Sequence, residues 1–134
     1  MMKTAHLQNL IVEPTMRGAY FDNISVPDLS MEGASIAANG KFVAIPWKSQ
    51  VSGGAVMVVP DMGQFKKFTY DDPLITGHKG TVTDLSFSPF LDNVLATASA
   101  DSSVKIWVIP HNGLTDDMME GHQHADLKSH SKKV

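Results

Sequence analysis

The sequence repeats itself at a distance of about 50 residues, and this repetition constrains the fold more than any other feature. Val58–Gly63 (VVPDMG) returns as Val108–Gly113 (VIPHNG), 50 positions later. Farther along, Ile75–Val82 is echoed by Leu127–Val134, and in both copies an apolar residue follows the histidine by four positions. Landmarks that recur in the same order indicate tandem copies of one small structural unit.

The segments between these landmarks have the pattern of short β-strands. Val94–Ala98 is a compact apolar run, and in Val104–Val108 three aliphatic residues alternate with Lys105 and Trp107. No segment of 10 or more residues keeps the 3.6-residue period of a helix. A unit of about 50 residues that holds three or four short strands is typical of a propeller blade. We therefore predict an all-β fold that forms a fragment of a β-propeller, about two blades long.

The stretch from Gly77 to Val108 carries the clearest motif in the chain. It reads GHKGTVTDLSFSPFLDNVLATASADSSVKIWV. This resembles the WD-repeat consensus, in which a Gly-His pair, an apolar strand with Phe-Ser-Pro, a small-residue strand, an Asp and a Trp follow in order. Val108 stands where the final Asp of the consensus would be.

The resemblance implies a structural role for four polar side chains. In WD blades the histidine, a Ser or Thr on the second strand, the loop Asp and the Trp form a chain of hydrogen bonds. The corresponding residues are His78, Thr97 (with Ser99 as the alternative), Asp101 and Trp107. A catalytic role is not expected, because the chain has no GxSxG elbow and no GxxxxGK[ST] phosphate loop.

The first copy of the repeat departs from the consensus. Met57 occupies the Trp position, and Val51 or Ser52 stands where the Asp would be. We therefore expect this copy to depend on apolar packing, through residues such as Phe42, Trp47 and Val58.

The first copy also resembles the amino-terminal region of coronins. The stretches that carry the resemblance are Phe21–Val26 (FDNISV), Ile36–Ala44 (IAANGKFVA) and Ser52–Pro60 (SGGAVMVVP). Ile109–Leu114 looks like the coronin passage from this blade to the next. The resemblance implies a seven-bladed propeller that binds filamentous actin and works with other cytoskeletal proteins, in the cytoplasm at the actin cytoskeleton.

The resemblance leaves the filament-contacting residues open. Many coronins carry a basic residue after the Ile of the Asp-Asn-Ile-type motif, whereas this chain has Ser25. The basic residues that could contact an acidic filament instead are Arg17, Lys41, Lys48, Lys66, Lys67, Lys128, Lys132 and Lys133. The alternative function is that of a general WD-repeat scaffold that recruits other protein partners.

Four histidines raise a third hypothesis, a metal-assisted hydrolase. They are His111, His122, His124 and His130. They lack a fixed His-x₃-His spacing on a firm element, and His130 fits better as the histidine of the next repeat. We therefore predict that the protein has no metal, no other cofactor and no enzymatic activity.

Composition excludes several other classes of protein. The net charge of −3 does not suggest a nucleic-acid binder, and the absence of cysteine rules out disulfides and thiolate metal sites. The longest apolar run, Ala55–Pro60, is far shorter than the ~20 residues that span a bilayer. We predict neither nucleic-acid binding nor membrane insertion.

The sequence predicts five segments. They are an N-terminal segment leading into the propeller (1–34), a degenerate first blade (35–76), a consensus WD repeat (77–113), an acidic inter-blade loop (114–126) and the start of the next repeat (127–134). Blades bury their faces against neighbours, so two blades leave two open apolar faces. We expect the 134-residue chain, expressed alone, to fold poorly, aggregate or self-associate.

Overall fold

The computed structural model describes residues 21–27, 36–49, 53–60 and 66–128. These residues form nine strands and no helix, so no described helix could cross a membrane. The predicted all-β fold is confirmed. The strands are β1 (Phe21–Asp22), β2 (Ala37–Ala38), β3 (Phe42–Trp47), β4 (Ala55–Pro60), β5 (Lys66–Lys67), β6 (Val82–Phe87), β7 (Val94–Ser99), β8 (Val104–Val108) and β9 (Ala125–Leu127).

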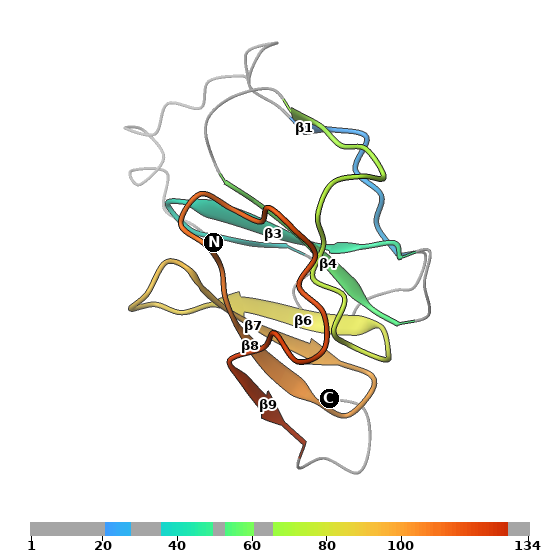
Figure 1. Ribbon diagram of the computed structural model, residues 1–134, viewed down its shortest axis with the longest axis vertical. Coiled ribbons are helices and arrows are strands. Elements are labelled where there is room, and N and C mark those ends of the chain that lie inside the picture. The colour runs from blue at the N-terminus through green and yellow to red at the C-terminus, as the bar shows by residue number, and fades with distance from the viewer. Residues whose placement is uncertain (1–20, 28–35, 50–52, 61–65, 129–134) are drawn as a thin grey trace, which may run out of the picture.

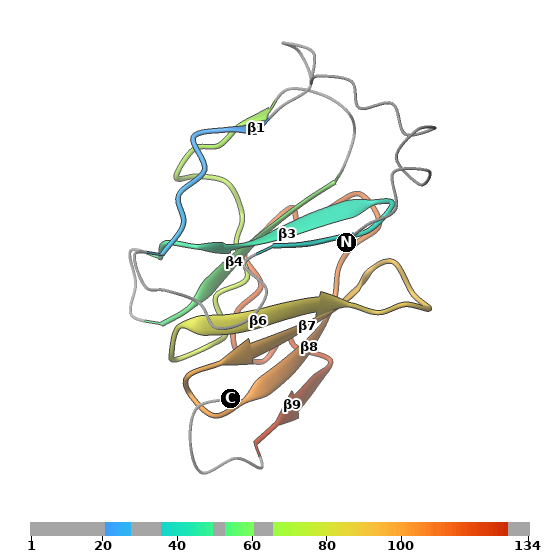
Figure 2. The same ribbon diagram turned by 180° about the vertical axis from the view of Figure 1, so that it is seen from behind.

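The strands form two main antiparallel sheets that follow one another along the chain. The first sheet has the order β2-β3-β4 and the second has the order β6-β7-β8-β9, so each is a simple meander. Figures 1 and 2 show β3 and β4 above the second sheet, while the short parallel pair of β1 and β5 lies on the far side of the first sheet. The two sheets have the arrangement expected of successive blades of a propeller fragment.

The two sheets share their strand register. Leu95 pairs with Trp107 in the second sheet, and Ile45 pairs with Met57 in the first. A shift of 50 residues carries the first of these pairs onto the second, which is the same offset that relates the VVPDMG and VIPHNG segments.

One apolar cluster joins the two sheets. It contains buried residues of the first sheet, such as Phe42 and Val58, together with Leu95 and Trp107 of the second. The ring of Phe42 stacks on that of Phe87 in β6, with 6.4 Å between the ring centroids. Because residues from both sheets bury the same surface, neither sheet has a separate core on this side.

The opposite face of the first sheet has its own cluster. Trp47, Met57 and Val59 pack there against Phe68, which follows β5. The rings of Trp47 and Phe68 meet edge to face with their centroids 5.3 Å apart. This packing agrees with the expectation that the degenerate copy depends on apolar contacts.

Among the described residues, no further sheet covers the face of the second sheet that points away from the first sheet. Register places Val94, Ala96, Ala98, Val104, Ile106 and Val108 on this face, and all are half-buried or exposed. Val108 is 44% exposed. This is one of the open apolar faces that two isolated blades are expected to leave.

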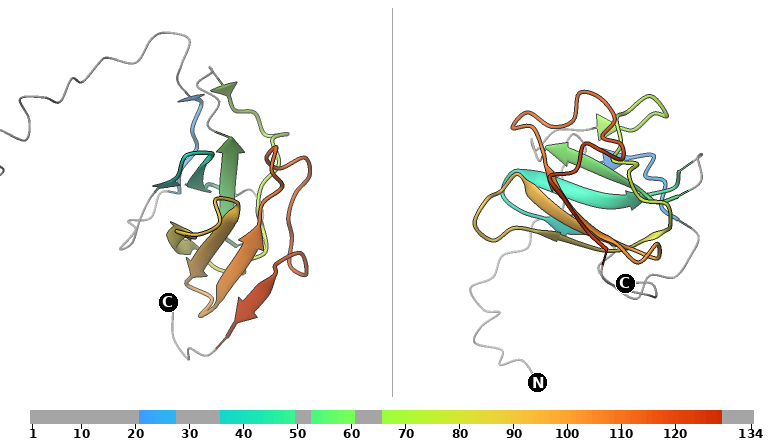
Figure 3. Two further views of the ribbon diagram at one scale, coloured as in Figure 1. Left: turned by 90° about the vertical axis from the view of Figure 1, so that its left-hand side faces the viewer. Right: turned by 60° about the horizontal axis from the view of Figure 1, so that its bottom comes forward.

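The segment after β8 does more than connect two blades. It leaves the second sheet at Ile109 and runs beside the segment that contains Ile75, as Figure 3 (left) shows in orange and yellow-green. There the amide of Thr76 donates to the carbonyl of Met118, and the amide of Met118 donates to the carbonyl of Leu74. The chain then returns to form β9, so Ala125 and Asp126, which the sequence interpretation assigned to the loop 114–126, belong to a strand.

Candidate functional site

The four polar residues singled out in the WD motif lie within hydrogen-bond distance of one another. Thr97 is at the centre, because its Oγ1 is 2.6 Å from His78 Nε2 and 2.9 Å from Trp107 Nε1. On the other side of the imidazole, His78 Nδ1 lies 3.2 Å from Asp101 Oδ2. The chain of contacts therefore runs from Trp107 through Thr97 and His78 to Asp101.

The chemistry of the donors assigns the protons in this network. The indole N–H of Trp107 can only donate, so Thr97 Oγ1 accepts a hydrogen bond from it. Thr97 Oγ1 donates its own proton to His78 Nε2, because the imidazole proton is on the other ring nitrogen. His78 Nδ1 faces an ionised carboxylate and therefore carries the proton of a neutral imidazole.

Burial and hydrogen bonding keep the network in this protonation state. Burial lowers the pKa of His78 below its ordinary value of 6.5, although the nearby Asp101 carboxylate opposes this effect. Partial burial raises the pKa of Asp101, but hydrogen bonds from Ser103, the Lys79 amide and His78 outweigh it and hold that pKa well below 3.8. A neutral imidazole beside an ionised carboxylate links strands here, because the Thr97 hydroxyl next to His78 is fully buried (0% exposed) and already accepts a hydrogen bond from Trp107.

The sequence interpretation missed two buried polar residues on the same face. Ser103 Oγ donates to Asp101 Oδ1 at 2.5 Å, and Lys105 is only 1% exposed with its Nζ 2.8 Å from Asp126 Oδ2. Both could have been found, because the two-residue period of a strand puts Lys105 and Ser103 on the same side as Trp107.

The turn between β3 and β4 fixes the first sheet against this network. Gly53 has φ of +115°, and a Cβ at this position would overlap the carbonyl oxygen of His78. At Gly54 a Cβ would meet the backbone of Gly80 and of Val82. The Gly-Gly turn of one unit therefore packs directly on the Gly-His segment of the next, and positions 53 and 54 have no room for a side chain.

The candidate filament-contacting lysines do not form one patch. Lys41, before β3, forms an ion pair with Asp92 at 3.2 Å, whereas Lys48 follows the other end of β3. Lys128 lies beyond β9 and contacts Asp126 at 2.9 Å. Lys66 and Lys67 belong to β5, where Lys66 contacts Asp72 at 2.7 Å. Arg17, Lys132 and Lys133 lie outside the described residues.

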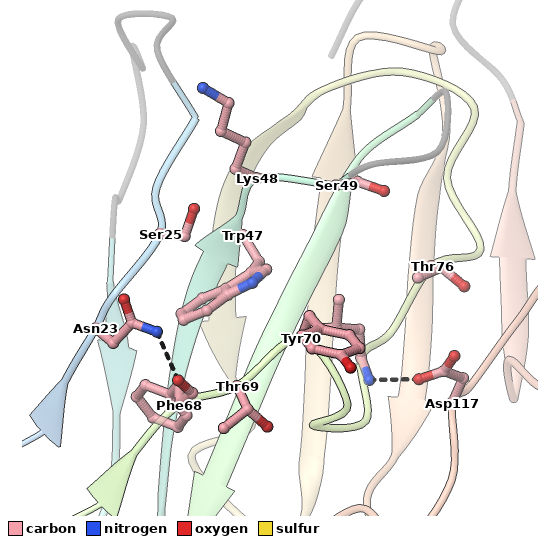
Figure 4. A pocket seen from close by; sticks show the side chains of 11 residues that line it. Asn23, Ser25, Trp47, Lys48, Ser49, Phe68, Thr69, Tyr70, Thr76 and Asp117 are labelled. Atoms are coloured by element: carbon pink, nitrogen blue, oxygen red, sulfur yellow. Dashed lines mark hydrogen bonds between the residues drawn. The ribbon is translucent and has the colours of Figure 1, made fainter.

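A pocket of about 430 Å³ lies beside the first sheet, between β3 and the segments that contain Asn23 and Thr69 (Figure 4). Trp47 and Tyr70 contribute aromatic surface to its wall, and Lys48 and Asp117 contribute opposite charges. Ser25, the position at which many coronins have a basic residue, lines the same pocket, and its carbonyl accepts a hydrogen bond from the Lys48 amide at 2.9 Å. The pocket could accept a side chain from a partner protein.

The histidine hypothesis receives no support from the described part of the chain. Within residues 21–27, 36–49, 53–60 and 66–128, no three His, Cys, Asp or Glu side chains gather in a way that could hold a metal ion. His122 instead accepts a hydrogen bond from the amide of Met119 at its Nδ1. His130 lies outside the described residues.

Two family models match the chain. Residues 1–66 match a domain of unknown function (DUF1899), and residues 71–108 match the WD domain, G-beta repeat. The second match covers the Gly-His segment and all four residues of the hydrogen-bond network.

Relatives and a solved structure agree with these models. Mouse (Mus musculus) Coronin-2B is 33% identical over 118 residues, which cover 88% of this chain and 24% of the relative. Dictyostelium discoideum Coronin-A is 34% identical over 98 residues, which cover 73% of this chain and 21% of the relative. The chain thus spans about a quarter of the length of these proteins.

The crystal structure of the WD40 domain from Toxoplasma gondii coronin has the same arrangement of strands. It matches with a TM-score of 0.74 and 28% identity, over 89% of this chain and 29% of that domain's chain. Sequence relatives, family models and fold point to the same group of proteins. The chain belongs to the coronin family and forms the N-terminal part of its WD-repeat β-propeller.

Proposed function

We propose that the chain is the part of a coronin-type propeller that contributes to binding filamentous actin, and that it acts as a protein-binding surface rather than as an enzyme. The observation that carries the proposal is the 33% identity to Coronin-2B over 88% of the chain. By the same reasoning we place the protein in the cytoplasm at the actin cytoskeleton, with other cytoskeletal proteins as further partners.

Physical chemistry suggests how such a surface would work. The sheets are rigid because buried polar and apolar contacts hold them together, so turns at their ends present side chains in fixed positions. Exposed lysines near an acidic filament mainly increase the association rate, and salt screens their effect. We therefore expect binding to weaken as ionic strength rises.

Co-sedimentation of the chain with actin filaments tests the proposal. A parallel spin without actin is needed, because the open face of the second sheet favours self-association that would also pellet protein. The proposal predicts saturable pelleting that depends on actin and decreases between low and physiological salt. If the chain stays in the supernatant in the parallel spin and filaments at low salt still pellet none of it, the proposal is contradicted.

A second candidate function is the recruitment of another protein, as in WD-repeat scaffolds generally. The pocket beside Trp47 favours it, because aromatic walls and two opposite charges suit the side chains of a peptide segment. This candidate predicts that Trp47→Leu leaves actin co-sedimentation unchanged but abolishes capture of a non-actin cytoskeletal partner. Loss of both activities in a folded variant would instead make the pocket part of the filament contact.

A further inference from the structure

The turn between β6 and β7 exposes two large apolar side chains side by side. Phe90 is 92% exposed and Leu91 is 59% exposed. Neither belongs to either of the apolar clusters that hold the sheets together. Single exposed apolar residues are common, whereas contiguous exposed apolar surface marks an interaction site.

Hydrogen bonds hold this turn in one conformation. Ser88 Oγ accepts from the amides of Phe90 and Leu91 at 3.1 and 3.2 Å. The Ser88 amide donates to the carbonyl of Val94 at 2.8 Å and closes the base of the turn. Because the backbone is already fixed, ordering it on binding would cost little conformational entropy.

The turn is also tied to the first sheet. Asn39 Nδ2 donates to the carbonyl of Asp92 at 2.7 Å, and the Lys41 ammonium lies 3.2 Å from the Asp92 carboxylate. Lys41 and Asp92 both remain about half exposed, at 51% and 46% of their side-chain surfaces. An apolar tip next to exposed charges has the anatomy of an interface centre with a polar rim.

We propose that Phe90 and Leu91 form an apolar anchor that inserts into a hydrophobic depression on the actin filament, with Lys41 at the rim of the same contact. The inference rests on the proposed function, and it selects the Lys41 end of β3 over the Lys48 end as the filament-facing surface. The anchor sets the lifetime of the complex, while Lys41 affects mainly its formation.

Actin co-sedimentation at low and at physiological salt tests this proposal with three single substitutions at the contact and two elsewhere. Phe90→Ser and Leu91→Ser should each raise Kd about tenfold or more at both salt concentrations. Lys41→Ala should weaken binding at low salt and have little effect at physiological salt. Of the two substitutions elsewhere, Met119→Ser is the control that should bind like the wild type, because it removes another exposed apolar side chain (54% exposed). Lys48→Ala tests the lysine at the opposite end of β3, which this proposal leaves outside the contact.

The outcomes distinguish this inference from the proposed function. The changed side chains at 90 and 91 are exposed, so circular dichroism and the urea midpoint should match the wild type and show that the variants fold. If the wild type binds filaments and both serine variants bind equally well, the anchor is refuted while the proposed function stands. If Lys48→Ala loses binding and Phe90→Ser does not, the contact lies at the other end. If the wild type is folded by circular dichroism but does not bind, both proposals fail.

Discussion

The two sheets bury equivalent strand faces with different chemistry. In the second sheet, the face that turns toward the first sheet buries His78, Thr97 and Lys105 beside Trp107. In the first sheet, the matching face buries Trp47 and Met57 against neighbouring apolar side chains. The polar network fixes one geometry because each buried donor needs its acceptor, whereas apolar packing tolerates substitutions that keep volume and shape. The polar network of the second sheet is therefore recognisable in the sequence as the WD-repeat motif, whereas the apolar packing of the first sheet leaves no such motif.

The largest effect should come from breaking the contact between the two regions. Gly53→Ala places a Cβ against the carbonyl oxygen of His78 and forces alanine to adopt a φ of +115°. We expect a loss of more than about 3 kcal/mol in the free energy of unfolding, since strain and overlap add. Urea denaturation followed by tryptophan fluorescence measures it.

Gly121→Ala is the matched control for that substitution. Gly121 has a similar φ of +101°, but a Cβ there would have nothing within 4 Å. The free energy of unfolding of this variant should therefore fall by about 1 kcal/mol, the conformational strain of alanine at a positive φ. Equal losses at the two glycines would show that the Gly-Gly turn does not pack on the Gly-His segment.

The next effect contrasts two substitutions of similar volume. Thr97→Val leaves Trp107 Nε1 and His78 Nε2 buried without partners, and should cost about 2–3 kcal/mol. Met57→Leu on the equivalent face of the first sheet should cost less than about 1.5 kcal/mol. Chemical denaturation of both variants would sharpen the contrast, and similar losses would remove the distinction between a polar and an apolar sheet.

A smaller effect should appear as a pH dependence of the free energy of unfolding, caused by His78 and Asp101 of the second sheet. The folded chain holds the pKa of His78 below 6.5, so as the pH falls below 6.5 the unfolded chain takes up the proton first and stability decreases. One proton limits the slope to about 1.4 kcal/mol per pH unit. Because the pKa of Asp101 is also lowered, further stability should be lost below about pH 4.

Urea midpoints of the wild type and of His78→Gln at pH 7.5 and 5.5 test this dependence. The variant should be less stable at both values, but its midpoint should change less between them because glutamine cannot titrate. If the wild type and the variant change equally, His78 is not the group responsible.

The smallest effect on folding should come from the open face of the second sheet. Val108→Asp puts a charge at the end of β8, where the side chain is already 44% exposed, so the free energy of unfolding should change by less than about 0.5 kcal/mol. Self-association should nevertheless decrease, because the charge interrupts the uncovered apolar surface. Sedimentation velocity measures the degree of self-association, and Tyr70→Asp is the control on a different surface. Equal sedimentation of the wild type and Val108→Asp would argue against association through this face.

The strands of the fold could be predicted from the sequence more fully than the contacts between distant segments. The repeated segments and the Gly-His to Trp motif predicted short strands in two tandem units, because turn residues and strand periodicity are local signals. The pairing of Lys105 with Asp126 was not predicted, since it depends on where the chain returns after a loop that first contacts Ile75. Ser103 could have been placed by strand periodicity alone. The packing of Gly53 on His78 depends on how two sheets meet, which no local pattern encodes.

The central claim is that two successive antiparallel sheets face each other through one shared core. Nuclear Overhauser contacts in the isotopically labelled chain test it most directly. The account predicts a contact between the rings of Phe42 in β3 and Phe87 in β6, together with cross-strand contacts of Leu95 with Trp107 and of Ile45 with Met57. Cross-strand contacts between β4 and β6, as in one continuous sheet, or the absence of any contact between Phe42 and Phe87 would contradict it.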